Sequence, residues 1–326
     1  MTTLRWGLLS TAHINRALIP ALQASARNEL VAVASRGIER AETYARKWNI
    51  PRAFGSYEEM LADPQVDVVY VSLPNSLHSE WTIKAARGRK HVLCEKPLAV
   101  TVEEVDTITT TAEQAGVTVA EALMYRHHPQ TLKVKGLVED GAIGKLRLVR
   151  GSFTFNITRL QDVRLNSALS GGSIWDVGCY PISYARLIVG AEPLEVFGWQ
   201  WSGPSQVDEA FLGQMRFEGE VFAQFDCGFR APFRTHLEIV GSEGTLTVPK
   251  PFKPGLDEQI FLARGDEGPQ TITIPGQELY AGEVEDMADA ILLGKAPCIG
   301  LADSRGNAAA IVTLLRSARE GRPMEV

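Results

Sequence analysis

Short apolar runs alternate with amphipathic segments through residues 1–124. The runs are LRWGLL (4–9), ELVAVASR (29–36), VDVVYVSL (66–73), HVLCEKP (91–97) and VTVAEALM (117–124). Apolar runs of this length, bounded by turn residues, predict buried strands. Between the runs, apolar residues recur at helical spacing, as from Ile14 to Leu22. This alternation predicts a parallel, doubly wound α/β sheet with helices on both faces.

From Lys145 the pattern changes to period two, which is typical of half-buried strands. Consecutive strands without intervening helices predict a large, open and mainly antiparallel sheet. Helical patterns return at 283–293 and 304–319. The chain is therefore expected to be an α/β protein with a dinucleotide-binding Rossmann domain at 1–124 and an α+β domain for substrate binding and oligomerisation at 125–326. The C-terminal helices are expected to pack back on the first domain.

Composition narrows the class of protein. The 326 residues carry 33 basic and 39 acidic side chains, a net charge of −6, which disfavours a nucleic-acid surface. Neither a long apolar run nor a signal-peptide pattern is present, so we expect a cytoplasmic protein with no membrane partner. The four cysteines and six histidines lack metal-ligand spacing, which predicts no metal site and no disulfide framework.

The turn after the first strand reads Gly7-Leu8-Leu9-Ser10-Thr11-Ala12-His13-Ile14-Asn15. A dinucleotide-binding turn has its GxGxxG glycines here, and this chain has Ser10, Ala12 and Asn15 instead. Small residues still allow the backbone to approach a pyrophosphate, and the amides of the helix start can hold it. The turn is therefore a candidate phosphate-binding loop, although the motif is incomplete.

The second strand ends where such folds recognise the ribose of the cofactor. An acidic residue there would bind the 2′-hydroxyl of NAD, but the chain offers Ser35, Arg36 and, one helical turn on, Arg40. A guanidinium pairs well with a 2′-phosphate. We therefore predict NADP as the cofactor, with NAD as the alternative.

Polar residues gather where two further strands end. Asn75 and His78 follow VDVVYVSL, and Glu95, Lys96 and Pro97 follow HVLC. Ligands bind at the carboxyl ends of parallel strands, so these side chains are expected near the nicotinamide ribose. The alternatives are that Lys96 is a surface lysine and that His78 caps the following helix.

A helix beginning at Gly171-Gly172 carries Asp176 and Tyr180. Their i, i+4 spacing places both side chains on one helical face. A lone tyrosine on a helix is more often packed core than catalyst, but the paired aspartate favours a functional site.

Five motifs, in order along the chain, carry a family resemblance: WGLLSTAHI, YVSLPNSLH, CEKPLA, EALMYRHHP and GGSIWDVGCYPIS. Together they resemble the Gfo/Idh/MocA oxidoreductases over nearly the whole chain. With tyrosine at position 180, the chain resembles one branch of this family. That branch contains glucose-fructose oxidoreductase, dimeric dihydrodiol dehydrogenase and NADP-dependent D-xylose dehydrogenase. The resemblance implies a nicotinamide cofactor, a cis bond between Lys96 and Pro97, and a catalytic pair drawn from both domains.

These arguments give one mechanism. Tyr180 exchanges the hydroxyl or carbonyl proton, Lys96 lowers the pKa of that phenol and anchors the cofactor ribose, and Asp176 orients the substrate. The candidate cofactor-binding residues are Gly7, Ser10, Thr11, Ala12, His13, Ile14, Ser35, Arg36, Arg40, Leu73, Pro74, Asn75, His78, Glu95, Lys96, Pro97 and Arg126. The candidate substrate-binding residues are Tyr125, His128, Arg164, Asp176 and Tyr180.

The expected activity is NADP(H)-dependent hydride transfer to or from a secondary alcohol, hemiacetal or carbonyl of a sugar or cyclic polyol. The alternatives are an inert NAD(P)-sensing regulator and an NAD-dependent glycosidase. Trp199, Trp201, Phe222 and Phe225 alternate on the predicted sheet strands. An open aromatic sheet face often becomes an oligomer interface, so we expect a homodimer or homotetramer formed through this face.

Overall fold

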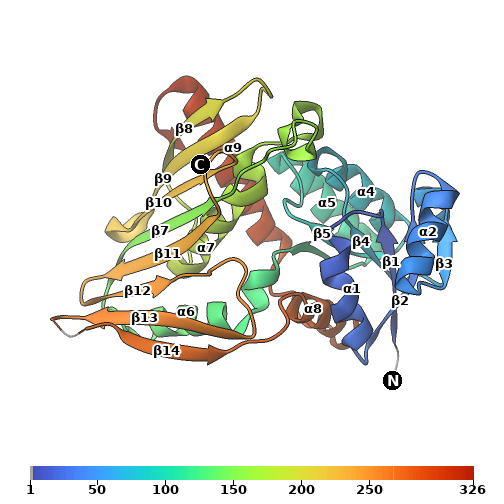
Figure 1. Cartoon of the computed structure of the whole chain (residues 1–326), viewed down its shortest axis with the longest axis horizontal. Coiled ribbons are helices and arrows are strands. Elements are labelled where there is room, and N and C mark those ends of the chain that lie inside the picture. The colour runs from blue at the N-terminus through green and yellow to red at the C-terminus, as the bar shows by residue number, and fades with distance from the viewer. Residues whose placement is uncertain (1–2, 267) are drawn as a thin grey trace. The chain divides into compact units, whose positions relative to one another are not determined.

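The computed structural model describes residues 3–266 and 268–326, which form two compact units (Figure 1). The first unit combines the chain up to Met124 with Tyr280–Arg305, and the second combines Tyr125–Leu279 with Gly306–Val326. Helix α9 (Leu301–Glu320) contains the third boundary, between Arg305 and Gly306. Residues 280–305 thus cluster with the first unit, whereas the sequence-based division assigned them to the range of the second domain.

The first unit is built on six parallel strands in the order β3-β2-β1-β4-β5-β6. They are β1 (Leu4–Leu9), β2 (Asn28–Ala34), β3 (Arg52–Phe54), β4 (Val68–Val71), β5 (His91–Glu95) and β6 (Val119–Ala122). The strand order reverses direction at β1, which is the topological switch point of a doubly wound sheet. The predicted Rossmann-type fold of this half is confirmed.

Helices connect these strands, and local sequence explains where several begin. They are α1 (Asn15–Ala24), α2 (Ile38–Trp48), α3 (Tyr57–Ala62), α4 (Asn75–Arg87), α5 (Val102–Ala115) and α8 (Ala281–Leu293). The Ser56 hydroxyl caps α3 by accepting from Glu59 N–H, and Thr101 caps α5 in the same way. Helix α8 packs on α1, where Arg27 Nε donates to Glu285 Oε2 at 2.8 Å.

The second unit is built on a nine-stranded sheet in the order β14-β13-β12-β11-β7-β10-β9-β8-β15. Its strands are β7 (Leu146–Thr154), β8 (Glu195–Ser202), β9 (Asp208–Arg216), β10 (Phe222–Gly228), β11 (Arg234–Gly241), β12 (Gly244–Val248), β13 (Asp257–Arg264), β14 (Gln270–Pro275) and β15 (Met324–Glu325). Strands β7 and β10 pair in parallel, while β10 with β9 and β11 with β7 pair antiparallel. The predicted open, mainly antiparallel sheet is confirmed.

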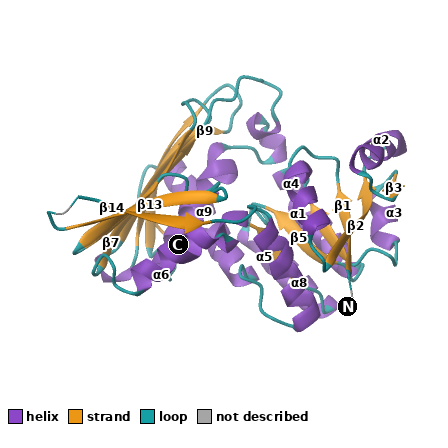
Figure 2. Cartoon of the chain, turned by 60° about the horizontal axis from the view of Figure 1, so that its bottom comes forward, coloured by secondary structure: helices purple, strands orange, loops and turns teal. Residues whose placement is uncertain are grey.

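Helices cover one face of this sheet (Figure 2). They are α6 (Pro129–Glu139), α7 (Cys179–Val189) and the later part of α9. A Cβ atom at Gly151 of β7 would lie 2.7 Å from Pro181 Cβ of α7, and Gly198 N–H of β8 donates to the Ser317 hydroxyl of α9. Glycine on the strand therefore lets helix and sheet approach closely.

The opposite face exposes large apolar side chains. Trp199 is 55% exposed, Trp201 48% and Phe222 49%. Phe225, which we predicted on the same face, is 5% exposed and stacks on Phe211 inside the unit. That prediction is wrong, because Phe222 and Phe225 are three residues apart and a strand alternates its side chains every residue. None of the helices within the described residues is both long and apolar enough to cross a membrane.

Candidate active site

In the turn from β1 to α1, the residue at the first glycine position of the fingerprint has a glycine-like backbone conformation. Ser10 has a φ of 151°, in the region that favours glycine. The hydroxyl of Ser10 donates to Ser72 O at 2.9 Å and accepts from Ala12 N–H at 3.0 Å. These bonds turn the side chain back toward β4, so that serine takes the place of the first fingerprint glycine without projecting into the turn.

Gly7 is packed closely inside the first unit. It lies inside β1, where a Cβ atom would meet Met60 Sδ at 2.9 Å and Val66 Cγ1 at 3.1 Å. Glycine at this position therefore allows close packing against α3, and its contribution to cofactor binding stays a prediction. The loop itself contains Thr11, Ala12, His13 and Ile14, and His13 is exposed.

The end of β2 brings two guanidinium groups to one place. Arg36 and Arg40 are exposed and Ser35 is buried. Arg40 Nε donates to Thr11 Oγ1 at 2.7 Å, which links α2 to the phosphate-binding turn. Burial raises the pKa of the Tyr57 phenol, and the charges of Arg36 and Arg40 partly offset that rise. The charges of Arg36 and Arg40 therefore both act at Tyr57.

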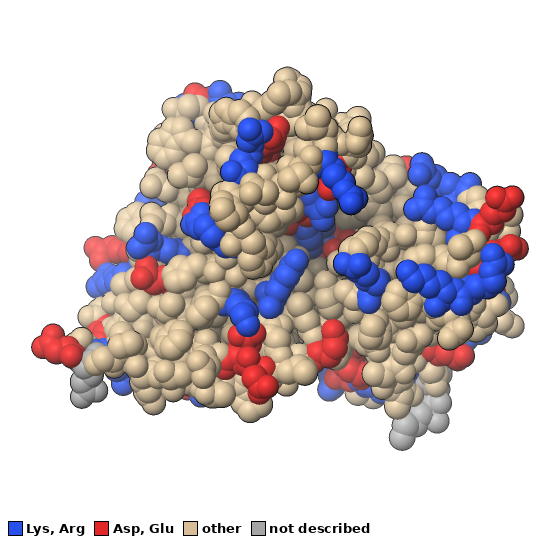
Figure 3. Space-filling model, viewed as in Figure 1, with Lys and Arg blue, Asp and Glu red and all other residues tan. Residues whose placement is uncertain are grey.

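These residues fit a phosphorylated dinucleotide. A groove of about 540 Å³ runs along α2, lined by Thr11, Arg40, Lys47 and three further α2 residues. Lys and Arg side chains gather over this part of the first unit (Figure 3). A cationic groove beside a small-residue turn suits the 2′-phosphate of a nucleotide whose pyrophosphate lies at the start of α1.

Lys96 lies in a loop that the surrounding structure holds rigidly. Its bond to Pro97 is cis, as the family resemblance implied. The Tyr70 hydroxyl donates to Glu95 just before Lys96, and Leu98 N–H just after it donates to Glu121 Oε1 at 3.1 Å. The loop at the end of β5 is thus held on both sides, which fixes the backbone that presents Lys96.

His78 ties the same loop to β4. It is 1% exposed, with Nδ1 2.6 Å from Pro97 O and Nε2 2.7 Å from Leu73 O. Burial lowers the pKa of His78 despite these carbonyl partners, so the neutral ring donates to one of them at neutral pH. His78 is not the helix cap that we considered, since α4 starts at Asn75 after Pro74 and has no side-chain cap.

In the second unit, Tyr180 lies within a cluster of aromatic rings. It is 4% exposed, and its ring centroid lies 5.5 Å from Phe153, 5.7 Å from Phe252 and 5.8 Å from Tyr125. Tyr125, predicted to bind substrate, is fully buried and donates through its hydroxyl to Ser183 Oγ at 2.9 Å. The rings hold the phenol of Tyr180 in a low-polarity environment.

Asp176 and Arg164, both predicted to bind substrate, lie together. Arg164 Nε donates to Asp176 Oδ2 at 2.7 Å, so one carboxylate oxygen is already engaged. Asp176 is part of a π-helical turn (Ile174–Gly178) that precedes α7. We expected one regular helix through Asp176 and Tyr180; the observed turn is wider, and such turns are frequent at functional sites.

The double glycine before this turn has a packing reason. A Cβ atom at Gly171 would lie 2.3 Å from Arg164 O, and one at Gly172 would lie 2.2 Å from Asp208 Oδ1. Gly172 also has a φ of 122°, which side chains disfavour. The two glycines therefore allow the segment at Arg164 and strand β9 to pack closely against the start of the helix.

Two other predicted residues have contacts within the second unit. His128 is fully buried; its Nδ1 accepts from Gln130 N–H at the start of α6, and its Nε2 lies 3.1 Å from Gly255 O. This capping role accounts for His128 without a substrate and corrects its assignment as a substrate ligand. Arg126 is 6% exposed and donates to Ser183 Oγ at 3.1 Å, and its contact with the cofactor stays a prediction.

Sequence reasoning missed several residues that hold the site. Glu121 was detectable, because a carboxylate interrupts the apolar run VTVAEALM. Tyr70 and Ser72 carried no signal, since their partners become neighbours only when β4 pairs with β5 and β1. Among the described residues, no group of His, Cys, Asp and Glu side chains could hold a metal ion.

A switch-point turn, a cationic groove at the end of β2 and a lysine held at the end of β5 define a nicotinamide-dinucleotide-dependent oxidoreductase. Residues 4–123 match the model of the oxidoreductase family with an NAD-binding Rossmann fold, and residues 131–247 match the GFO/IDH/MocA C-terminal domain. The chain belongs to the Gfo/Idh/MocA oxidoreductase family. The predicted family, enzyme class and nicotinamide cofactor are confirmed.

Similar proteins include enzymes that act on sugars. The chain is 34% identical to a D-xylose 1-dehydrogenase (NADP⁺) of Haloferax volcanii, over 98% of this chain and 99% of that protein. An aldose-aldose oxidoreductase of Caulobacter crescentus, solved with glycerol, matches with a TM-score of 0.92 and 27% identity, over 99% and 100% of the two chains. A 3-ketoreductase of Actinomadura kijaniata, solved with NADP and TDP-benzene, matches with a TM-score of 0.92 and 29% identity, over 97% and 98%.

Proposed function

We propose that this protein is an NADP(H)-dependent oxidoreductase that interconverts a secondary alcohol or hemiacetal and the corresponding carbonyl of a sugar or cyclic polyol. The observation that carries the proposal is the rigidly held Lys96 loop, bound by Tyr70, His78 and Glu121. A group that takes part in catalysis must be held in a fixed position beside the reacting centre, and this loop fixes the backbone of Lys96. The three relatives described above, whose names refer to a sugar or a ketone, support the substrate class.

Bound NADP(H) would supply or accept the hydride at its nicotinamide ring. Tyr180 exchanges the proton of the substrate hydroxyl or carbonyl oxygen. An unperturbed phenol holds its proton to about pH 10, and a nearby ammonium group lowers that pKa, which is the role we assign to Lys96. Asp176, oriented by Arg164, positions the substrate through its carboxylate group.

The assay for this function follows the NADPH absorbance when the purified protein is mixed with NADP and a panel of pentoses, hexoses and cyclic diols. We expect substrate-dependent NADPH formation with at least one sugar or diol. Tight NADP binding without turnover on any member of the panel would contradict the proposal and favour a regulator. Hydrolysis of a glycoside without net NADPH would favour a glycosidase.

The choice of NADP over NAD is proposed to depend on Arg36 and Arg40. A charge-assisted hydrogen bond contributes about 1.5–3 kcal/mol, so Arg36→Ala is expected to lower kcat/KM with NADP by roughly 10-fold or more. The value with NAD should change little, because NAD lacks the 2′-phosphate. The measurement is the ratio of kcat/KM for the two cofactors.

Arg46→Ala is the matched control for Arg40→Ala, since both arginines are exposed on α2 but only Arg40 lines the groove. It should leave the cofactor ratio at the wild-type value. A ratio that stays unchanged in both Arg36→Ala and Arg40→Ala would refute the assignment of the 2′-phosphate to these residues.

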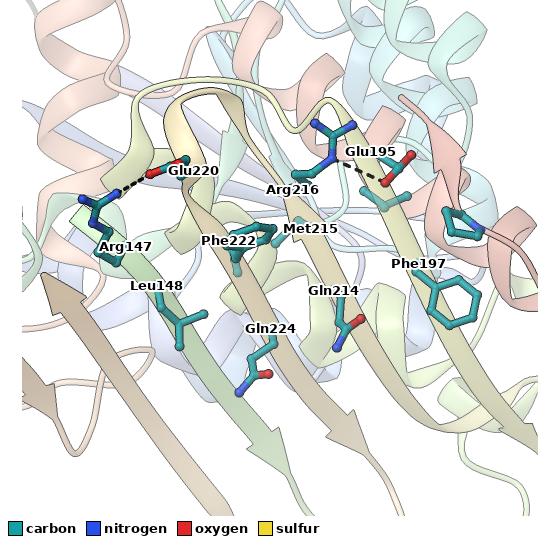
Figure 4. Close-up of a pocket in the computed structure, with 13 residues that line it drawn as sticks. Arg147, Leu148, Glu195, Phe197, Gln214, Met215, Arg216, Glu220, Phe222 and Gln224 are labelled. Carbon is teal, nitrogen blue, oxygen red and sulfur yellow. Dashed lines mark hydrogen bonds and ion pairs between the residues drawn. The ribbon is translucent and has the colours of Figure 1, made fainter. Parts of the chain in front are cut away.

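The open face of the nine-stranded sheet is proposed to join copies of this chain into a homodimer or homotetramer. A groove of about 900 Å³ on this face is lined by Leu148, Phe197 and Phe222 with flanking charged residues (Figure 4). Two ion pairs, Arg147–Glu220 and Arg216–Glu195, lie at its edge. An apolar centre with a charged rim is the usual composition of a protein interface.

Adding charge to this face should separate the copies. We expect Trp199→Lys with Leu212→Lys to reduce the mass measured by light scattering to that of one chain, because both residues are 55% exposed and face each other across β8 and β9. Leu256→Lys, which changes an exposed leucine just before β13 that does not line this groove, is the control. An unchanged mass in the double variant would contradict this interface.

We also propose that the protein acts in the cytoplasm. The support is its composition, with a net charge of −6 and four cysteines without disulfide-type spacing. Fractionation of cells that express the tagged chain would test this, and recovery outside the cytoplasmic fraction would contradict it.

A further inference from the structure

A buried carboxylate lies at the start of the helical segment that carries Asp176 and Tyr180. Asp208, the first residue of β9, is 5% exposed. Its Oδ2 atom accepts hydrogen bonds from the Ser173 hydroxyl and from Ile174 N–H, both at 2.7 Å. The Ile174 amide belongs to the first turn, which has no side-chain cap within the helix itself. Asp208 therefore supplies from β9 the acceptor that this helix start lacks.

The segment is fitted closely to this carboxylate. Gly172 leaves no room for a side chain beside Asp208 Oδ1, as described above, and Asp176 N–H donates back to Gly172 O at 3.1 Å. The chain thus passes from the Asp208 contact to Asp176 within one turn, and to Tyr180 within the next. A small displacement of the Asp208 carboxylate would therefore also shift the side chains of Asp176 and Tyr180.

The surroundings of Asp208 favour its titration near neutral pH. The titratable group nearest to it is Cys227 on β10, and Asp226 on β10 and Cys179 on α7 act in turn on Cys227. The Ser173 hydroxyl, which bonds Asp208, also lies 3.6 Å from Cys227 Sγ. Burial raises the pKa of Asp208 to about 6, although the Ser173 hydroxyl and nearby backbone N–H groups act in the opposite direction.

We propose that Asp208 is a positioning residue for hydride transfer: its ionised carboxylate fixes the first turn of the helical segment and thereby the positions of Asp176 and Tyr180. A protonated carboxyl group can still accept a hydrogen bond, but the bonds from Ser173 and Ile174 to a neutral acceptor are weaker than those to a carboxylate. Protonation therefore weakens the attachment of the helix start to β9. This inference rests on the proposed role of Tyr180.

The test is the pH dependence of kcat, measured from about pH 4.5 to 8 in the wild type and in Ser173→Ala. Removing a donor from a carboxylate raises its pKa, so the acidic limb of the profile should move to higher pH in Ser173→Ala. Asp208→Asn cannot ionise and should lose this limb. Its kcat should stay at the low value of the protonated wild type at all pH values, about 10-fold below the wild-type kcat at pH 8, while KM for NADP stays near wild type.

Asp257→Asn is the matched control, because Asp257 also begins a strand of the same sheet, β13, but is exposed. It should leave the profile unchanged. An acidic limb that stays at the wild-type pH in Ser173→Ala overturns the inference, even if Asp208→Asn proves unstable. A purely structural role of Asp208 would lower yield or stability without moving the limb.

A second measurement does not depend on activity. A carboxyl group whose pKa rises from 3.8 to about 6 on folding binds its proton more tightly in the folded state. It therefore makes the folded state less stable as pH rises through that interval. Asp208→Asn should remove this slope from the pH dependence of unfolding, and an unchanged slope overturns the titration of Asp208. An active Tyr180→Phe variant would instead contradict the proposed chemistry and leave this slope in place.

Discussion

Tyr180→Phe is expected to lower kcat by about 10²–10⁴-fold, which is the usual contribution of a positioned proton donor or acceptor. The substitution removes the phenolic oxygen and keeps the ring, so the contacts with Phe153, Phe252 and Tyr125 remain. Stability and the KM for NADP should therefore stay near wild type. Steady-state kinetics with the best sugar of the panel, together with a melting curve, measures this.

Tyr184→Phe provides the comparison. Tyr184 is fully buried on the same helix, one turn after Tyr180, and stacks on Tyr125 at 5.3 Å. Loss of its hydroxyl should leave kcat within a few-fold of wild type. If Tyr180→Phe is as active as Tyr184→Phe, the proton passes through another group and the proposed mechanism is wrong.

Lys96→Met is the second variant with a large expected effect. It keeps the length of the side chain and removes the ammonium group that we propose lowers the pKa of Tyr180. Without that charge the phenol should retain its proton at neutral pH, so oxidation of the alcohol should slow by about 100-fold or more at pH 7. Because the phenol ionises near its ordinary pKa of about 10, activity should recover partly as pH rises. The pH profile of kcat measures this.

Lys84→Met separates the role of Lys96 from a general effect of lost charge. Lys84 lies on α4, where its ammonium group pairs with Glu80 at 2.6 Å. Its loss should not change the profile. A Lys96→Met enzyme that loses activity equally at all pH values would show that Lys96 holds the cofactor or substrate without altering the pKa of Tyr180.

The sequence predicted the fold class well because the burial of strand and helix faces produces a periodic pattern of apolar residues. Strands buried on both faces, such as β4 and β5, appear as continuous apolar runs, and half-buried strands such as β9 alternate. The caps formed by Ser56 and Thr101 are local in another sense, because each hydroxyl accepts from an amide three residues further along the chain. Such local relations do not need the tertiary structure.

Predictions failed where side-chain direction or backbone detail decided the outcome. Phe225 was placed on the open face although its register turns it inward. The close packing of Gly7 against Met60 was also not predicted. The π-helical turn at Asp176 was not expected, because Gly171 and Gly172 indicate a close approach but not which segment approaches. Each of these depends on a partner far away in sequence.

The sequence alone determined the alternation of strands and helices, the motifs of the oxidoreductase family and the residue types available for chemistry. Only the tertiary structure revealed how those residues are held. Ser72 fixes the serine that replaces a glycine, Glu121 and His78 fix the Lys96 loop, and Asp208 fixes the start of the Tyr180 helix. The reason is physical: periodicity records which side chains avoid water, whereas a hydrogen bond between distant residues exists only after the chain has folded.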